Sequence, residues 1–223
     1  MSLPIELDHV VVFTHVNAPE AQTLESLGLR GFGGTTRHGN LGTSSTSFFF
    51  EQHYLELFWI HDEPAAQNAL APLGFDLDAR VAWRGTSASP FGLMFRWLPG
   101  ASGPLPFPTR QLRAEWMPGE VFVDFAAEVS AEPYYGVVPG DLSYLSFKSN
   151  IAEPAHIQGI KQLNRVWITV TSDALSPIAR LLSTNGLVSL QSGASPLMEL
   201  TFDTGVQGKT LDIRPTLPLV LTY

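Results

Sequence analysis

The sequence predicts an α+β fold in which one unit, a strand, a helix and then a run of about three strands, occurs twice. Residues 5–14 and 162–170 each form a strand rich in β-branched and aromatic residues. Each is followed by a helical pattern and then by short strands divided by Gly, Pro and Ser. We therefore expect a single domain, with a first unit at about 5–62, an inserted middle region at about 63–159 and a second unit at about 160–215.

The first unit opens with "DHVVVFT", whose Val and Phe residues favour a strand. "NAPEAQTLESLGLRG" then indicates a short helix, and Gly28 is placed to end it. A glycine-rich turn over 29–40 precedes two further strands at 43–52 and 53–62. The second unit repeats this order, with a helix at 172–186 and three short strands that end by 215.

The middle region is less regular. Apolar runs predict strands at 90–100, 119–129 and 142–149, and "DEPAAQNALAPLG" indicates a short helix. Between the first two of these strands, residues 98–119 are rich in Pro and Gly and are expected to form a long ordered loop. The role of this loop stays open.

Composition excludes several classes of protein. The 223 residues include no cysteine, which removes disulfides, thiolate catalysis and Cys-based zinc sites. The net charge is −8 and the basic residues are scattered, so we expect no nucleic-acid partner. No run of 18 apolar residues and no signal-peptide pattern is present, so we expect no membrane span and a cytoplasmic location.

Several short motifs, in this order, carry a family resemblance: "LDHVVVFT", "LGL", "TRHGNLGTSSTSFFFEQHYLELFWIHD" and, later, "AHIQGIKQLNRVWITV". They resemble glyoxalase-like proteins of the vicinal-oxygen-chelate (glyoxalase/bleomycin resistance/dioxygenase) superfamily. The likeness is good over 5–62, fair over 155–214 and poor between. It implies paired β-α-β-β-β units that form a cupped mixed sheet, with the first strand of each unit beside the fourth. It also implies metal ligands on those two strands.

Carried over by this resemblance, His9 takes the ligand position of the first strand and Glu56 that of the fourth. In the second unit, Asn164 and Asp212 take the corresponding positions, where His and Glu would be typical. An imidazole and a carboxylate suit Zn, Mn or Fe, whereas an amide is a poor ligand. The expected divalent metal site is therefore weak or absent. Glu56 is also the candidate catalytic residue, as a group that shuttles a proton.

Other candidates come with alternatives. His9 could instead be a buried histidine that is hydrogen-bonded to Glu56, with no ligand role. Arg37 and His38 lie in a glycine-rich turn that could aim them at a ligand, or they could be solvated. The indoles of Trp97 and Trp167 could line a substrate pocket, although such rings are more often part of a core.

Two functions of different classes follow. The first is a metal-dependent lyase, isomerase or dioxygenase that acts on a small oxygenated molecule. The alternative is a metal-free protein of the same fold that binds or sequesters a small molecule. Both expect a small-molecule ligand as the partner, and a homodimer stays open.

Overall fold

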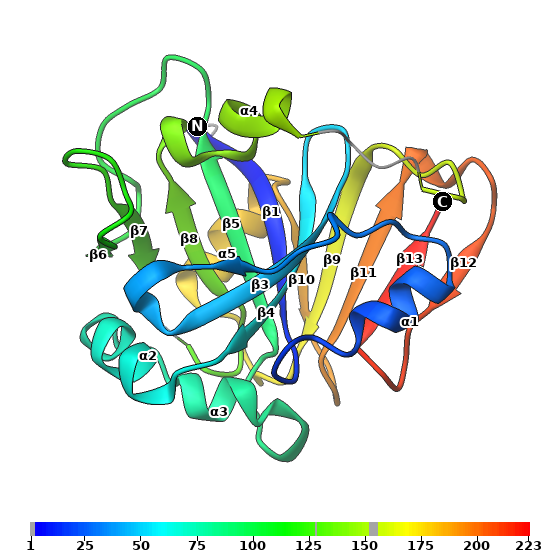
Figure 1. The fold of residues 1–223 in the computed structure, drawn as a ribbon, viewed down its shortest axis with the longest axis horizontal. Coiled ribbons are helices and arrows are strands. Elements are labelled where there is room, and N and C mark those ends of the chain that lie inside the picture. The colour runs from blue at the N-terminus through cyan, green and yellow to red at the C-terminus, as the bar shows by residue number, and fades with distance from the viewer. Residues whose placement is uncertain (1–2, 128, 152–155) are drawn as a thin grey trace.

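The computed structural model describes residues 3–127, 129–151 and 156–223. It is a mixed α+β structure with two mixed sheets, one of eight strands and one of five, which lie side by side (Figure 1). The predicted strand 119–129 and the predicted middle region include residues 128 and 152–155, which lie outside the described residues.

The first half of the eight-stranded sheet comes from the N-terminal unit. Its strand order is β2-β3-β4-β1, and β1 and β4 run parallel. Helix α1 connects β1 to β2, as the helical pattern before Gly28 predicts. The elements are β1 (Ile5–Phe13), α1 (Ala21–Ser26), β2 (Thr36–Arg37), β3 (Thr43–Phe49) and β4 (Tyr54–Ile60).

The second half of this sheet comes from the middle of the chain. Its order is β5-β8-β7-β6, with β5 and β8 parallel, so it repeats the order of the first half. The two halves join where β1 and β5 pair antiparallel. The strands are β5 (Phe91–Trp97), β6 (Thr109–Leu112), β7 (Val123–Ala126) and β8 (Tyr134–Val138).

This arrangement corrects the expected organisation. The middle region is not an insertion, because it supplies four strands of the eight-stranded sheet. Residues 160–215 do not pair with the first unit; they belong to the separate five-stranded sheet, of order β10-β9-β11-β13-β12. The order of elements along a chain does not specify which strand edges pair, and here β9 pairs with β10 and β11. The elements are β9 (Leu163–Val170), α5 (Pro177–Thr184), β10 (Ser189–Ser192), β11 (Leu197–Phe202), β12 (Thr210–Asp212) and β13 (Leu219–Thr222).

One local prediction, for a short segment of the middle region, also failed. The predicted strand at 142–149 is wrong, because α4 (Tyr144–Phe147) is helical. The buried carboxylate of Asp8 accepts a hydrogen bond from the main-chain N–H of Tyr144 at 3.0 Å, and the Tyr144 hydroxyl donates to the Phe50 carbonyl at 2.8 Å. These long-range contacts hold the start of the helix and are not visible in the local pattern.

The two faces of β1 lie in two different cores. Val10 and Val12 pack into the larger core, which includes residues of α1, α5 and the five-stranded sheet. Val11 and Phe13 lie in the smaller core, beneath α2 (Glu63–Leu70) and α3 (Leu77–Val81). Burial on both faces explains the nearly continuous apolar run of β1.

Within the described residues, no helix is both long and apolar enough to cross a bilayer.

Replacing Gly92 with Ala should destabilise the sheet. A Cβ at this position would overlap the ring of Tyr134, which is held by Phe13, Phe75 and Phe125. Overpacking of this kind costs about 1–3 kcal/mol. Urea unfolding of Gly92→Ala should show that loss, whereas Gly34→Ala, with nothing within 4 Å of the new Cβ, should unfold like wild type. Equal midpoints for both variants would contradict the packing.

Candidate functional site

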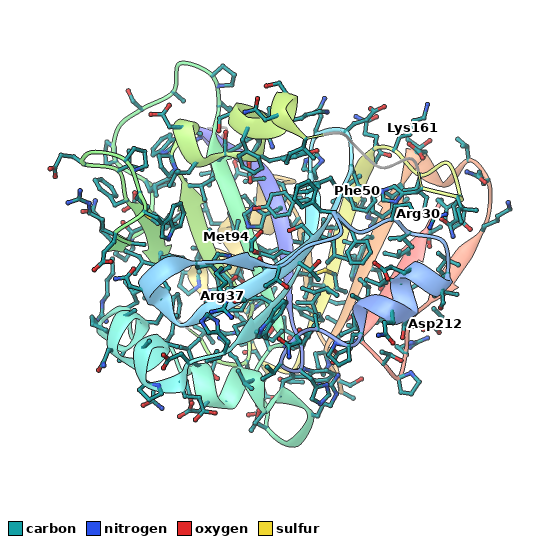
Figure 2. All side chains as sticks on the ribbon, in the orientation of Figure 1. Arg30, Arg37, Phe50, Met94, Lys161 and Asp212 are labelled. Carbon is teal, nitrogen blue, oxygen red and sulfur yellow. The ribbon has the colours of Figure 1, made fainter. Side chains whose placement is uncertain are left out.

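A cavity of about 190 Å³ lies on the face of the eight-stranded sheet that α2 and α3 cover. Its wall combines residues from both halves of the sheet with residues of the helices and of the loop 113–117. Figure 2 marks Met94, which lies on the wall, on β5 in the left part of the molecule. Most of the lining is apolar, and its polar side chains include His9, His38, Tyr54 and Glu56.

His9 is positioned by an irregularity in β1. Leu7 pairs with Phe95 and His9 with Met94, so Asp8 is an extra residue in the strand, a β-bulge. The bulge brings the Asp8 carboxylate next to the imidazole, whose Nδ1 donates to Asp8 Oδ2 at 2.8 Å. Arg96 Nη1 donates to the other Asp8 oxygen at 3.3 Å. Asp8 is fully buried, and these two contacts pair its charge. Its bond to Nδ1 orients the His9 ring so that Nε2 faces the cavity.

Glu56 lies between two imidazoles. Its Oε2 is 3.5 Å from His9 Nε2, and its Oε1 is 3.6 Å from His38 Nε2. Glu56 is only 9% exposed and His9 only 6%. The Tyr54 ring stacks on His9 with centroids 4.1 Å apart, and its hydroxyl lies 3.3 Å from His9 Nε2. His9, His38, Tyr54 and Glu56 form the polar end of the cavity.

The pKa values of His9 and Glu56 show that the two side chains form an ion pair at neutral pH. Burial alone would lower the pKa of His9, but hydrogen bonds to Asp8 and Glu56 outweigh burial and raise it to about 9. Burial alone would raise the pKa of Glu56, but the hydrogen bond to His9 and the nearby positive charge lower it to about 2. At neutral pH, His9 is therefore an imidazolium and Glu56 a carboxylate.

His38 differs from His9 in charge. Burial lowers its pKa, and the positive charge of His9 adds to that effect, although Glu56 opposes it. Its Nδ1 lies 2.9 Å from Thr43 Oγ1, and its ring stacks on Phe58 at 5.6 Å. A neutral imidazole has one donor and one acceptor nitrogen. His38 can therefore exchange hydrogen bonds with a ligand without adding a charge.

The two halves of the sheet are matched in register but not in chemistry. His9 pairs with Tyr54 across β1 and β4, and the matching pair across β5 and β8 is Gly92 with Tyr134. In the same way, Glu56 is matched by Gly136. A Cβ on Gly136 would lie 2.6 Å from Met94 Cε, so this side chain fills the space above the glycine. The second half therefore contributes apolar surface where the first contributes an ion pair.

The four expected metal ligands do not converge. Asn164 and Asp212 lie on the five-stranded sheet, where both are exposed. Asn164 accepts from the main-chain N–H of Thr204 at 2.8 Å, and Asp212 pairs with Arg214. Figure 2 shows Asp212 on the opposite side of the molecule from Met94. Their assignment as ligands is wrong because the segment that carries them belongs to the other sheet.

Only some of the expected substrate-binding residues line the cavity. His38 lines the cavity with His9, but Arg37 is exposed. Trp97 lies instead at a second cavity, lined mainly by residues between β5 and β7, and Trp167 lies on the five-stranded sheet under the guanidinium of Arg165. These three residues therefore do not belong to the site. Arg37 belongs to β2, whereas His38 follows it and its Nδ1 lies 2.9 Å from Thr43 Oγ1, on a residue that also lines the cavity.

Sequence reasoning missed Asp8 and Tyr134, and it placed Tyr54 on the face of Glu56 without assigning it a role in the site. Asp8 directly precedes His9, and an acidic residue beside a strand histidine was the available signal. Strict alternation, however, would place the two side chains on opposite faces. Tyr134 lies in a segment for which no strand was expected, so nothing connected it with His9.

The side chains at the polar end include types that bind metal ions. Two imidazoles and a carboxylate suit Zn, Mn or Fe, and the contact of His9 with Asp8 is typical of a metal-bound histidine. However, residues 3–127, 129–151 and 156–223 contain no group of three or more His, Asp and Glu side chains that could hold a metal ion. His9 also holds a proton on Nε2 at neutral pH, which an ion would have to displace. As arranged here, the residues do not fit a metal.

Comparison with known proteins yields the fold alone. No protein-family model and no curated protein matches the chain. A hypothetical protein from Staphylococcus aureus is similar over 97% of this chain and 98% of its own, with a TM-score of 0.54 and 9% identity. At that identity, the likeness shows a shared fold and nothing about function. The hypothetical protein BH1468 from Bacillus halodurans C-125 covers 60% of this chain and 94% of its own at 15% identity, but its TM-score of 0.37 supports no argument.

Replacing Asp8 with Asn should lower the pKa of His9 from about 9, because the amide keeps the shape but not the charge. The raised pKa contributes stability that is fully present below about pH 6.5 and lost as pH rises through about 9. In Asp8→Asn, the contribution of His9 to the free energy of unfolding should therefore be smaller, and it should be lost at a lower pH than in wild type. NMR titration of the His9 ring, with urea unfolding between about pH 6 and 10, measures both.

The exposed Glu51→Gln is the matched control, and it should titrate like wild type. An unchanged His9 pKa in Asp8→Asn would show that Asp8 does not hold the imidazolium.

Proposed function

We propose that this protein binds or sequesters a small, largely apolar molecule in the cavity of the eight-stranded sheet, without a metal. The observation that carries the proposal is the cavity itself, which has mainly apolar walls and a cluster of buried polar groups at one end. Binding sites for small molecules typically combine apolar walls with a few placed polar groups. The ligand would bury its apolar part against the walls and direct its polar end towards Glu56 and His38.

The strand order supports a proposal about the fold as well. Two halves of identical order, joined through β1 and β5, are what a paired-unit cup of the vicinal-oxygen-chelate type requires. We place the second unit of such a cup at residues 91–138. The five-stranded sheet then packs against the face of the cup that is opposite the cavity, because its residues share the larger core with Val10 and Val12.

The ion pair favours binding over proton transfer by Glu56. A general base works best when its pKa lies near the working pH. The pKa of Glu56 is lowered to about 2 by His9, so its carboxylate holds a proton poorly at neutral pH. A fixed carboxylate is nevertheless an effective hydrogen-bond acceptor.

Filling the cavity should weaken binding. Val138 lines the wall and is buried, so Val138→Phe should weaken binding of 4-ethylphenol at least tenfold by removing the space for the ring. Isothermal titration calorimetry measures the affinity, and thermal unfolding confirms that the variant is folded. Val206→Phe makes the same change at an exposed position and should bind like wild type. Equal affinity of the two variants would place the ligand elsewhere.

A metal-dependent lyase, isomerase or dioxygenase acting on a small oxygenated molecule is the second candidate. One observation favours it: both imidazoles, of His9 and His38, approach the same carboxylate to within 3.6 Å. For this function, these side chains would have to close on a Zn, Mn or Fe ion and lose the His9 proton.

Metal titration separates the two candidates. If the second is correct, metal-stripped protein should bind Mn²⁺ or Zn²⁺ at micromolar or weaker affinity, and His38→Ala should abolish the heat. Asn164→His should change nothing, because Asn164 lies on the other sheet. Heats that are equal in wild type and His38→Ala would eliminate a metal at this position.

A further inference from the structure

Apart from Arg80, the charged and imidazole side chains of the cavity gather at one end. His9 on β1, Glu56 on β4 and His38 after β2 meet there, whereas the positions that match His9 and Glu56 in the second half of the sheet are Gly92 and Gly136. The remaining wall is mainly apolar and includes Phe75, Leu77, Met94, Phe125 and Val138. A ligand that fits this wall therefore has one polar end and an apolar body.

The charged groups at the polar end and directly behind it sum to a negative charge. Glu56 at the polar end and Asp8 behind His9 contribute two carboxylates, and His9 contributes one cation that is shared between them. Arg96 pairs with Asp8 and also with the Glu6 carboxylate, at 2.8 Å, so it adds no net positive charge. The Glu56 carboxylate would repel an anionic group brought into this low-dielectric space.

Arg80 also lines the cavity, but its guanidinium is engaged with the main chain. Its Nη1 donates to the Ser89 carbonyl at 2.8 Å, and its Nη2 donates to the Glu132 carbonyl at 3.0 Å. The guanidinium also lies 5.9 Å from the centre of the Tyr134 ring. These contacts hold the segment 129–132 against α3, so Arg80 is built into the fold.

The polar end matches a group that can both donate and accept. Glu56 is an acceptor, and neutral His38 offers its Nε2, 3.3 Å from Ser45 Oγ. The flanking rings are aromatic: Tyr54 stacks on His9, and Phe58 stacks on His38 and meets Phe13 edge to face at 5.2 Å. Aromatic walls favour a flat ring in the ligand.

We propose that the cavity selects an aromatic molecule that ends in one neutral hydroxyl, of the phenol class, and rejects molecules that end in a carboxylate. The hydroxyl donates to Glu56 and accepts from His38, while the ring and its alkyl substituent lie towards Met94 and Phe125. This inference rests on the proposed binding function and adds the class of ligand to it.

Three probes of the same shape test the selection by isothermal titration calorimetry: 4-ethylphenol, 4-ethylanisole and 4-ethylbenzoate. The phenol should bind at least tenfold more tightly than the ether, which lacks the donor, and than the carboxylate, which is repelled. Glu56→Gln removes the charge at constant shape, so the preference over 4-ethylbenzoate should fall at least severalfold. Glu199→Gln, exposed on β11, should retain the wild-type preference.

The outcomes separate the two levels of the proposal. If all three probes bind equally, or if Glu56→Gln leaves the preference unchanged, the phenol class is wrong although the cavity binds small molecules. Tight binding of 4-ethylbenzoate would likewise overturn the inference and would indicate an anion held at Arg80. If no probe binds to wild type, the proposed binding function fails, and the ligand class fails with it.

Discussion

The structure depends on the burial of His9, a charged group in a strand that is covered on both faces. An isolated charge in such a place would be strongly unfavourable. The bulge in β1 solves this by bringing the Asp8 carboxylate to Nδ1, while Glu56 of the parallel strand β4 lies near Nε2. Asp8 in turn holds Arg96 and the start of α4. One buried imidazolium thus connects β1, β4, β5 and α4.

The same arrangement makes the cavity asymmetric. The two halves of the sheet share strand order and register, but the ion pair of one half is replaced in the other by Gly92 and Gly136. Tyr134 and Met94 occupy the space above these glycines. The cavity therefore has one polar end and one mainly apolar end, and this difference, more than the fold itself, underlies the proposed function.

The prediction from sequence was most successful where the pattern was local. Alternation in "HYLELFWI" places Glu56 on the same face as Tyr54 and Phe58, and all three line the cavity with His9. The prediction failed where distant strands had to be matched: Asn164 and Asp212 were assigned by the resemblance, with 160–215 taken as the second unit, yet they lie on a different sheet. Repetition of order along the chain carries no information about which edges pair, and the true partner strands, 91–138, show a weaker repeat because a loop replaces their helix.

The sequence by itself determined the N-terminal β-α-β-β-β segment and the absence of thiol chemistry, since both depend on residue type and on short-range periodicity. The candidacy of His9 and Glu56 came from the family resemblance. Only the tertiary structure decided that β5 joins β1, that Asp8 turns to the side of His9, and that His38 enters the cavity while Arg37 does not. These outcomes depend on strand pairing and on a single extra residue in β1. Neither is encoded in a local pattern, because both arise from the competition of all the strands for partners and of buried charges for opposite charges.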